Sequence, residues 1–230
     1  MDKVQIIEKL FFYIVAFSYL ILPLSFLLTK AKRRDLIPLV ITIYGVICCA
    51  MLVAYFELPK DLKKIHHTVY TSFEYVAFAF IFGYNIQNKK IRKLIFFVSI
   101  LFLVFQLVFL LITGYTRLDS LSIGVETILI LIYIFFFFYE SAKTTNTQYI
   151  YNHYCFWIAV GILIYLGGSF FFYILFGQLT KEQVDTFGNL TFLAELIKNV
   201  LFALAVFMYK RYPMQNVNQK QEPVPFLDMI

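Results

Sequence analysis

Residues 94–113 of the chain read LIFFVSILFLVFQLVFLLIT, and none of them carries a charge. An α-helix rises about 1.5 Å per residue, so roughly 20 apolar residues cross the ~30 Å hydrocarbon core of a bilayer. A membrane β-strand would instead show about 10 residues in which apolar and polar side chains alternate. The stretch therefore predicts a transmembrane α-helix.

The composition of the whole chain agrees with this prediction. Of its 230 residues, 61% are hydrophobic and 15% are charged, whereas charged residues make up about a quarter of an average soluble domain. Once several apolar spans are counted, too little of the chain remains for a soluble catalytic domain. The composition excludes a cytosolic enzyme, a secreted disulfide scaffold and a disordered protein.

Six further stretches resemble residues 94–113 in length and in their low content of charge. The seven expected spans are 9–28, 36–56, 67–84, 94–113, 121–139, 154–176 and 187–209. They predict an all-α, polytopic membrane protein in which a seven-transmembrane-helix bundle occupies residues 1–212. The polar residues 213–230 are expected to form a short, disordered cytoplasmic tail.

Lysine and arginine concentrate on one side of these spans. Twelve of the 20 follow the first, third, fifth and seventh spans, and seven lie on the opposite side. Because cytoplasmic loops carry the excess of basic residues, the N-terminus is expected outside and the C-terminus in the cytoplasm of a multi-pass protein of the cytoplasmic (inner) membrane. This pattern also accounts for the net charge of +6, so the expected partner is the lipid bilayer and not nucleic acid.

Small residues recur in the sixth span. Gly161, Gly168 and Ser169 lie at helical spacing, and Gly167 is adjacent to them. Small side chains allow the backbone of a second membrane helix to come close. We therefore expect this face of the helix to pack against a neighbour.

The ionisable residues within the expected spans are Glu74, Glu126, Glu195 and Lys198. A charge at the centre of a membrane helix costs at least ~2.5 kcal/mol on insertion scales, so such residues usually face the bundle interior and mark function. Counted from the apolar boundaries, the three carboxylates lie at a similar depth, on the order of 10 Å below the outer surface. They predict a polar pocket in the outer half of the bundle. In it, Lys198 neutralises one carboxylate and at least one other holds a proton.

Other polar side chains repeat at helical spacing beside these charges. The candidate ligand-binding or ion-relay residues are Glu74, Glu126, Glu195, Lys198, Asn199, Tyr70 and Tyr165. Three interpretations stay open: a buried network that only fixes the helix register, a ligand or ion site, and a proton-coupled or catalytic role.

Other chemistry finds little support in the sequence. A lysine midway along a seventh helix is a gross feature of microbial rhodopsins, but the single tryptophan, Trp157, is too few for a retinal pocket. His67 and Glu74 lie two helical turns apart, too far to share a metal ion. No nucleophile elbow, zinc-protease motif or phosphate-binding glycine loop occurs. We expect no catalytic residue, no metal and no cofactor, and hence a protein that is not an enzyme.

Four strings carry a resemblance to a known group. They are YTSFEYVAFAFIFGYNIQNKKIRK (70–93), GVETILILIYIFFFFYE (124–140), FWIAVGILIYLGGSFFFYIL (156–175) and AELIKNVLFALAVF (194–207). They resemble uncharacterised bacterial seven-helix membrane proteins, and similar regions form the membrane input domains of some histidine kinases. The resemblance implies a sensory role in which the positions of Glu74, Glu126 and Lys198 match recurring patterns.

These observations predict a receptor-like sensory protein that binds a small ligand, ion or lipid headgroup in the outer-half pocket. The 230 residues hold no dimerisation helix, phospho-accepting histidine region or ATP site, so a separate cytoplasmic signalling protein is expected to receive the signal. The alternative is a small proton-coupled transporter that uses the same carboxylates as a relay. A lipid-acting membrane enzyme and a purely structural membrane protein have less support.

Overall fold

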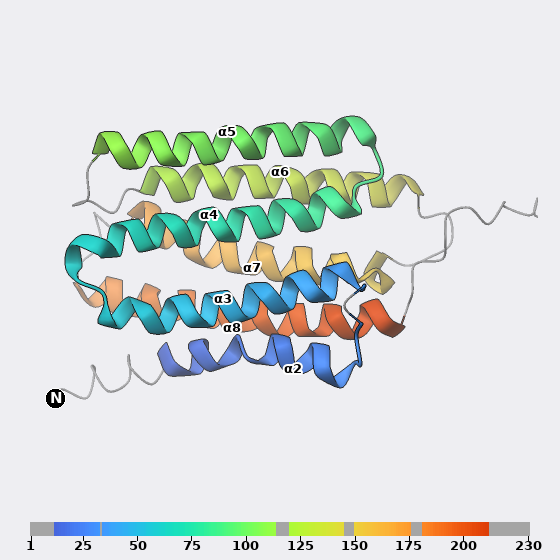
Figure 1. Cartoon of the computed structure of the whole chain (residues 1–230), viewed down its shortest axis with the longest axis horizontal. Helices are drawn as coiled ribbons and strands as arrows, with labels where there is room; N and C mark the ends of the chain where they lie inside the picture. Colours follow the sequence, from blue (N-terminus) through green and yellow to red (C-terminus); the bar gives the residue numbers. More distant parts are fainter. Residues whose placement is uncertain (1–11, 33, 114–119, 145–149, 176–180, 212–230) are drawn as a thin grey trace, which may run out of the picture.

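The computed structural model describes residues 12–32, 34–113, 120–144, 150–175 and 181–211, and all regular structure among them is helical (Figure 1). Residues 12–18 form a helical segment that leads through a turn at 19 and 20 into the first labelled helix. The labelled helices are α2 (Ile21–Leu28), α3 (Leu36–Glu57), α4 (Lys60–Asn85), α5 (Lys89–Thr113), α6 (Ser120–Thr144), α7 (Tyr154–Leu175) and α8 (Lys181–Arg211), with a short 3-10 helix, η1 (Ile150–Asn152), before α7.

Within the described residues, each of the seven expected spans contains helix, although the turn at 19 and 20 interrupts the first. Four helical stretches are long and apolar enough to cross a membrane: Leu36–Tyr55, Lys89–Ile112, Leu121–Lys143 and Phe187–Arg211. Two shorter apolar stretches are Phe12–Leu28 and Tyr154–Phe170. The predicted all-helical class is thus confirmed, and four of the helices have the length and apolar composition that a membrane span requires. The tail expected to be disordered lies outside the described residues.

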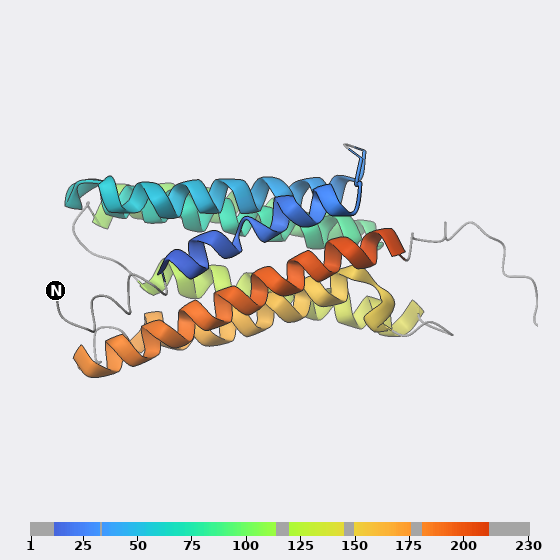
Figure 2. The ribbon, with the colours of Figure 1, turned by 90° about the horizontal axis from the view of Figure 1, so that it is seen from below.

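Helix α4 lies at the centre of the bundle. It packs against α3, α5, α6 and α7, while α7 and α8 run along each other. Helix α2 packs on α3 and α8 at one edge, and α5 packs on α4 at the other edge (Figures 1 and 2). Neighbours on several sides bury one face of α4, which carries Glu74, while Val69, Val76 and Phe80 on its other face are exposed. A buried face of this kind can hold polar and charged side chains.

Pro23 explains the turn that interrupts the first helix. Proline has no N–H, and its ring clashes with the carbonyl four residues earlier, which here belongs to Tyr19. The N–H of Leu22 donates to Tyr19 O over 3.2 Å instead. Gly45 of α3 packs against this turn, because a Cβ placed on it would lie 2.9 Å from both Tyr19 O and Leu22 Cβ. The side chain of Tyr19 is fully buried in the bundle.

Helices α7 and α8 approach closely at the small residues of α7. A Cβ at Gly168 would lie 2.9 Å from Ala194 Cβ, and one at Gly161 would lie 3.3 Å from Leu201 Cβ. A Cβ at Gly167 would meet nothing within 4 Å. The expected packing role is therefore confirmed for Gly161 and Gly168, and it places α8 firmly against α7 at the level of Glu195.

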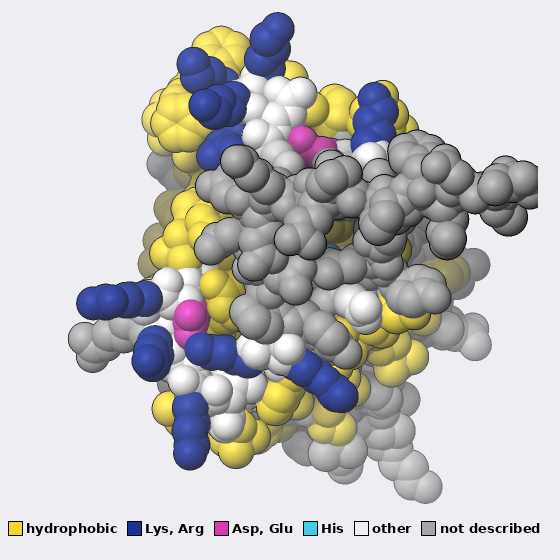
Figure 3. Space-filling model, turned by 90° about the vertical axis from the view of Figure 1, so that its right-hand side faces the viewer, with side chains coloured by type: hydrophobic (Ala, Val, Ile, Leu, Met, Phe, Trp, Pro, Cys, Tyr) yellow, Lys and Arg dark blue, Asp and Glu magenta, His cyan; other side chains and the backbone are white. Residues whose placement is uncertain are grey.

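Basic side chains gather at one end of the bundle, where Figure 3 shows them around its rim. They come from the turns and helix ends that contain residues 30, 32 and 34, residues 89–93 and residues 210–211. The carboxylate of Glu140, at the end of α6, accepts hydrogen bonds from the N–H groups of Gln87 and Asn88, each over 2.8 Å. Glu140 thereby caps the start of α5, where a negative charge is favourable.

Candidate functional site

Lys198 of α8 is fully buried at the centre of the bundle. Its Nζ donates to Tyr44 Oη over 2.7 Å, to Glu74 Oε1 over 3.2 Å and to Tyr19 Oη over 3.4 Å. A buried ammonium is tolerated only when it is paired and hydrogen-bonded. Its three partners satisfy this requirement, and they come from the turn that precedes α2, from α3 and from α4.

Glu74 of α4 is the carboxylate that pairs with this ammonium, and its side chain is 4% exposed. Tyr44 Oη donates to Glu74 Oε1 over 2.5 Å, and Tyr165 Oη donates to Glu74 Oε2 over 3.0 Å. Tyr44 therefore bridges the ion pair, because it accepts from Lys198 and donates to Glu74. Hydrogen bonds to both carboxylate oxygens compensate part of the cost of burying the charge.

A second carboxylate, Glu195, lies one turn before Lys198 on α8. Tyr19 Oη donates to Glu195 Oε1. Tyr19 also lies 3.2 Å, hydroxyl to hydroxyl, from Tyr70, and Tyr70 Oη donates to Glu74 Oε1 over 3.5 Å. The two carboxylates are thus connected through tyrosine hydroxyls. We call this group the central cluster: Tyr19, Tyr44, Tyr70, Glu74, Tyr165, Glu195 and Lys198.

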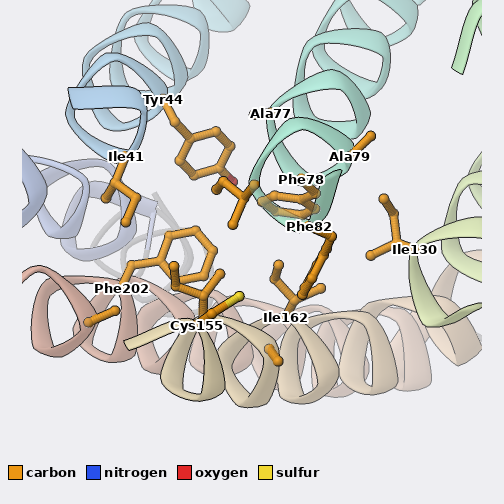
Figure 4. Close-up of a cluster of buried hydrophobic side chains, with 14 of the residues drawn as sticks. Ile41, Tyr44, Ala77, Phe78, Ala79, Phe82, Ile130, Cys155, Ile162 and Phe202 are labelled. Atoms are coloured by element: carbon orange, nitrogen blue, oxygen red, sulfur yellow. The ribbon is translucent and has the colours of Figure 1, made fainter. Parts of the chain in front are cut away.

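Aromatic rings enclose the charges. Lys198 Nζ lies 3.8 Å from the centre of the Tyr165 ring, within the range of a cation–π interaction. The Tyr44 ring packs against Phe78 and Phe202, with centroid distances of 5.5 and 5.9 Å. Figure 4 shows Tyr44, Phe78 and Phe202 converging from α3, α4 and α8. Apolar packing of this kind excludes water and strengthens the ion pair.

The central cluster contains two carboxylates and one ammonium. Lys198 and Glu74 neutralise each other, and the described residues place no second cation on Glu195. An unpaired buried carboxylate is costly and takes up a proton or a cation. The cluster therefore has the composition of a site that holds one further positive charge.

Helix lengths place the cluster near the middle of α4. Helix α4 begins at Lys60 and α8 at Lys181, whereas the corresponding expected apolar spans begin at 67 and 187. At 1.5 Å per residue, Glu74 lies about 21 Å from the start of α4 and about 17 Å from its end. The cluster is thus close to the middle of α4 measured between its two ends, while its position in the outer half of the bundle stays a prediction.

Five of the seven candidate residues belong to the central cluster: Tyr70, Glu74, Tyr165, Glu195 and Lys198. Glu126 of α6 does not join its hydrogen bonds, although the residue is buried, and Glu126 Oε1 finds no partner among the described residues. Asn199 lies beside the cluster, where its Nδ2 donates to Ser18 Oγ over 2.8 Å. The hydrogen bonds of the central cluster therefore include two of the three expected carboxylates, and Glu126 lies near enough to Glu74 and Lys198 to interact with their charges.

The candidates predicted from the sequence omitted Tyr19 and Tyr44. Both are tyrosines in otherwise apolar stretches, and a buried tyrosine hydroxyl generally has a hydrogen-bond partner. Tyr19 also lies four residues before Pro23, a position at which a helix is commonly interrupted. These two signals were available in the sequence.

Metal chemistry gains no new candidate from the part of the chain that the structure describes, where no three residues among His, Cys, Asp and Glu form a group that could hold a metal ion. Comparison with protein-family models, curated proteins and solved structures finds no match to this chain. The function is therefore argued from the geometry of the central cluster.

Proposed function

We propose that the chain is a receptor-like sensory protein of the cytoplasmic membrane, with seven membrane-spanning helices, the N-terminus outside and the C-terminus in the cytoplasm. Four long apolar helices and two shorter apolar stretches support a multi-pass arrangement. The basic rim at one end of the bundle supports the orientation, since the positive end faces the cytoplasm.

The sensing element is the central cluster, which binds a small cationic ligand, and in the simplest case a proton. One observation carries this proposal: a fully buried ammonium is matched by one carboxylate, while a second carboxylate one turn away has only hydroxyl partners. Binding of a positive charge at Glu195 competes with Lys198 for the shared tyrosine hydroxyls, so it changes which helices the network connects.

The output is a change at the basic end of the bundle, which a separate cytoplasmic signalling protein reads. Lys198 connects α8 to α3, α4 and the turn that precedes α2, and these four helices end or begin at the basic rim. At that rim, Lys210 of α8 forms an ion pair with Asp35, which precedes α3. A rearrangement in the centre is thereby transmitted along rigid helices to the surface.

The experiment measures distances between spin labels at Arg34→Cys and Lys90→Cys, two exposed positions of the basic end. Lys198→Met and Glu74→Gln should shift the distance distribution in the same direction, because each opens the same ion pair. Glu126→Gln is the matched control, since it neutralises a buried carboxylate outside the hydrogen bonds of the cluster. Unchanged distances in both ion-pair variants would overturn the proposal.

The nature of the signal is tested with the same labels at pH 5 to 9 and with added Na⁺ or K⁺. We expect the wild-type distances to respond to one of these ions and Glu195→Gln to abolish the response. A response that survives in Glu195→Gln, or a wild type that ignores all three ions, would contradict a cationic signal at Glu195.

A proton-coupled transporter is the second candidate, and the connection of Glu74 to Glu195 through tyrosine hydroxyls favours it. Hydroxyl chains between carboxylates can pass protons. Reconstituted vesicles with a pH-sensitive dye test this reading. A proton flux that Glu74→Gln abolishes would favour a transporter over a sensor. If no proton flux is found and the spin-label distances respond to an ion, the sensor is favoured.

A further inference from the structure

A lateral groove lies between α4 and α5, and one of its lining residues, Phe73, stacks on Tyr44 of the central cluster with ring centroids 6.1 Å apart. Its lining residues are Thr68, Val69, Ser72, Phe73 and Val76 of α4 and Leu103, Gln106, Leu107 and Leu110 of α5. Val69 and Leu107 are 52% and 59% exposed, so the groove is open to the outside of the bundle. Because α5 lies at the edge of the bundle, that outside is the hydrocarbon of the bilayer.

Gln106 is the residue of this groove that has an unmet hydrogen-bonding need. The side chain is buried, with 2% of the residue exposed. Ser122 Oγ of α6 donates to Gln106 Oε1 over 2.6 Å, which orients the amide, but Gln106 Nε2 has no partner among the described residues. A buried amide N–H without an acceptor is destabilising, because it has lost its hydrogen bond to water and gained none. A molecule in the groove that supplies an acceptor relieves this cost.

The rest of the groove is apolar. Most lining side chains are hydrocarbon, and Ser72 Oγ donates to the backbone oxygen of Thr68 over 2.8 Å. None of the described residues that line the groove is charged. The walls therefore suit a neutral, apolar molecule, and the Phe73 ring offers it a flat aromatic contact.

We propose that this groove binds a neutral, bilayer-soluble carbonyl compound of the lipid-quinone class, with a ring carbonyl accepting a hydrogen bond from Gln106 Nε2 and the apolar tail extending into the bilayer. Gln106 lies about 10 Å from the end of α5 at Thr113. A phospholipid ester carbonyl is held near the interface by its polar headgroup, whereas a quinone ring has apolar groups on both sides of its carbonyl and can enter at this depth.

The test uses the full chain in detergent and measures thermal stabilisation during titration with decylubiquinone. Decylbenzene has the same tail and no carbonyl, and methyl oleate represents acyl lipids. We expect saturable stabilisation by decylubiquinone, weaker stabilisation by the other two, and about 3- to 10-fold weaker quinone binding in Gln106→Leu, as loss of one neutral hydrogen bond implies. Gln106→Leu should leave decylbenzene binding unchanged.

A pair of substitutions on α5 keeps the test decisive if Gln106→Leu folds poorly. Leu103→Phe fills the groove and should abolish quinone binding, and Leu101→Phe, at an exposed position outside the groove, should not. Equal binding of decylbenzene and decylubiquinone shows an apolar cleft without carbonyl recognition, and tighter binding of methyl oleate shows an acyl-lipid site. Either result, or a failure of Leu103→Phe to weaken binding, overturns the proposal. The spin-label distances at the basic end, which test the proposed sensory function, do not depend on this quinone proposal, so each of the two proposals can fail without the other.

Discussion

The ammonium of Lys198 lies 3.8 Å from the centre of the Tyr165 ring, while the hydroxyl of the same tyrosine donates to Glu74 Oε2 over 3.0 Å. One side chain of α7 thus contacts both charges of the ion pair, through its face and through its polar tip. The two contacts use different atoms, so substitutions can separate them.

Tyr165→Phe removes the hydroxyl and keeps the ring. We expect it to lower the free energy of unfolding by about 1.5–3 kcal/mol, the usual range for a hydrogen bond to a charged group. Tyr165→Leu also removes the ring, and the lost cation–π contact should add up to about 2 kcal/mol. Denaturant titration of the purified protein measures both. Equal stability of the Phe and Leu variants would show that the ring contact contributes nothing.

Gly168→Ala and Gly167→Ala form a matched pair on one turn of α7. The new methyl of Gly168→Ala would lie 2.9 Å from Ala194 Cβ, so α8 must move away from α7. We expect a loss of about 1–3 kcal/mol, as for other overpacked sites. Gly167→Ala meets open space and should be neutral or stabilising by up to about 1 kcal/mol, because alanine favours a helix. Thermal unfolding compares the two, and the reverse order would refute the close approach.

Asp35 gives a prediction on pH. Partial burial acts to raise the pKa of its carboxyl, but hydrogen bonds from Lys210 and from the Lys32 N–H outweigh this effect and hold the pKa below its usual value. A carboxyl with a lowered pKa in the folded state stabilises the fold above its unfolded pKa of about 3.9, and this contribution is lost as the pH falls through the folded pKa.

Wild type should therefore unfold at a higher temperature than Asp35→Asn at pH 7, and the difference should vanish as the pH falls below about 4. The pair is partly exposed, so the effect at pH 7 should be about 1 kcal/mol or less and should shrink in 1 M salt. Lys210→Met removes the same pair and should show the same pH dependence. A gap that persists at pH 3 would contradict the assignment.

Lys30, two residues after the end of α2 at Leu28, has an unfavourable backbone conformation. Its φ is +50°, in the left-handed region, and the N–H of the next residue, Ala31, donates to Phe26 O over 3.2 Å. This hydrogen bond marks a helix end at which glycine is preferred. Because the side chain is exposed, Lys30→Gly should stabilise the protein by about 1 kcal/mol.

Lys32→Gly is the control for this change, since it removes the same charge from the same turn. Among the described non-glycine residues, Lys30 is the one with positive φ. Lys32→Gly should therefore be neutral or destabilising, because glycine there only increases the entropy of the unfolded chain. If both variants change the unfolding temperature equally, charge and not backbone conformation is responsible.

The sequence by itself determined the helical membrane class and the residues that matter most. Apolar length must match the bilayer, and a charge inside such a stretch must face the interior, so Glu74, Glu195 and Lys198 were identifiable without coordinates. The same reasoning selected Tyr70 and Tyr165 by helical spacing, and it selected the small residues of α7 that allow α8 to approach.

Only the tertiary structure decided which of these residues meet. Periodicity gives the buried face of each helix, but it does not give the rotation and height of one helix relative to another, because those depend on packing between all of them. Glu126 therefore looked equivalent to Glu74 and yet lies outside the hydrogen bonds of the cluster. Tyr19 and Tyr44 were not among the residues selected from the sequence and yet complete the ion pair, because a proline turn and a glycine contact bring the turn before α2 and α3 together at that level.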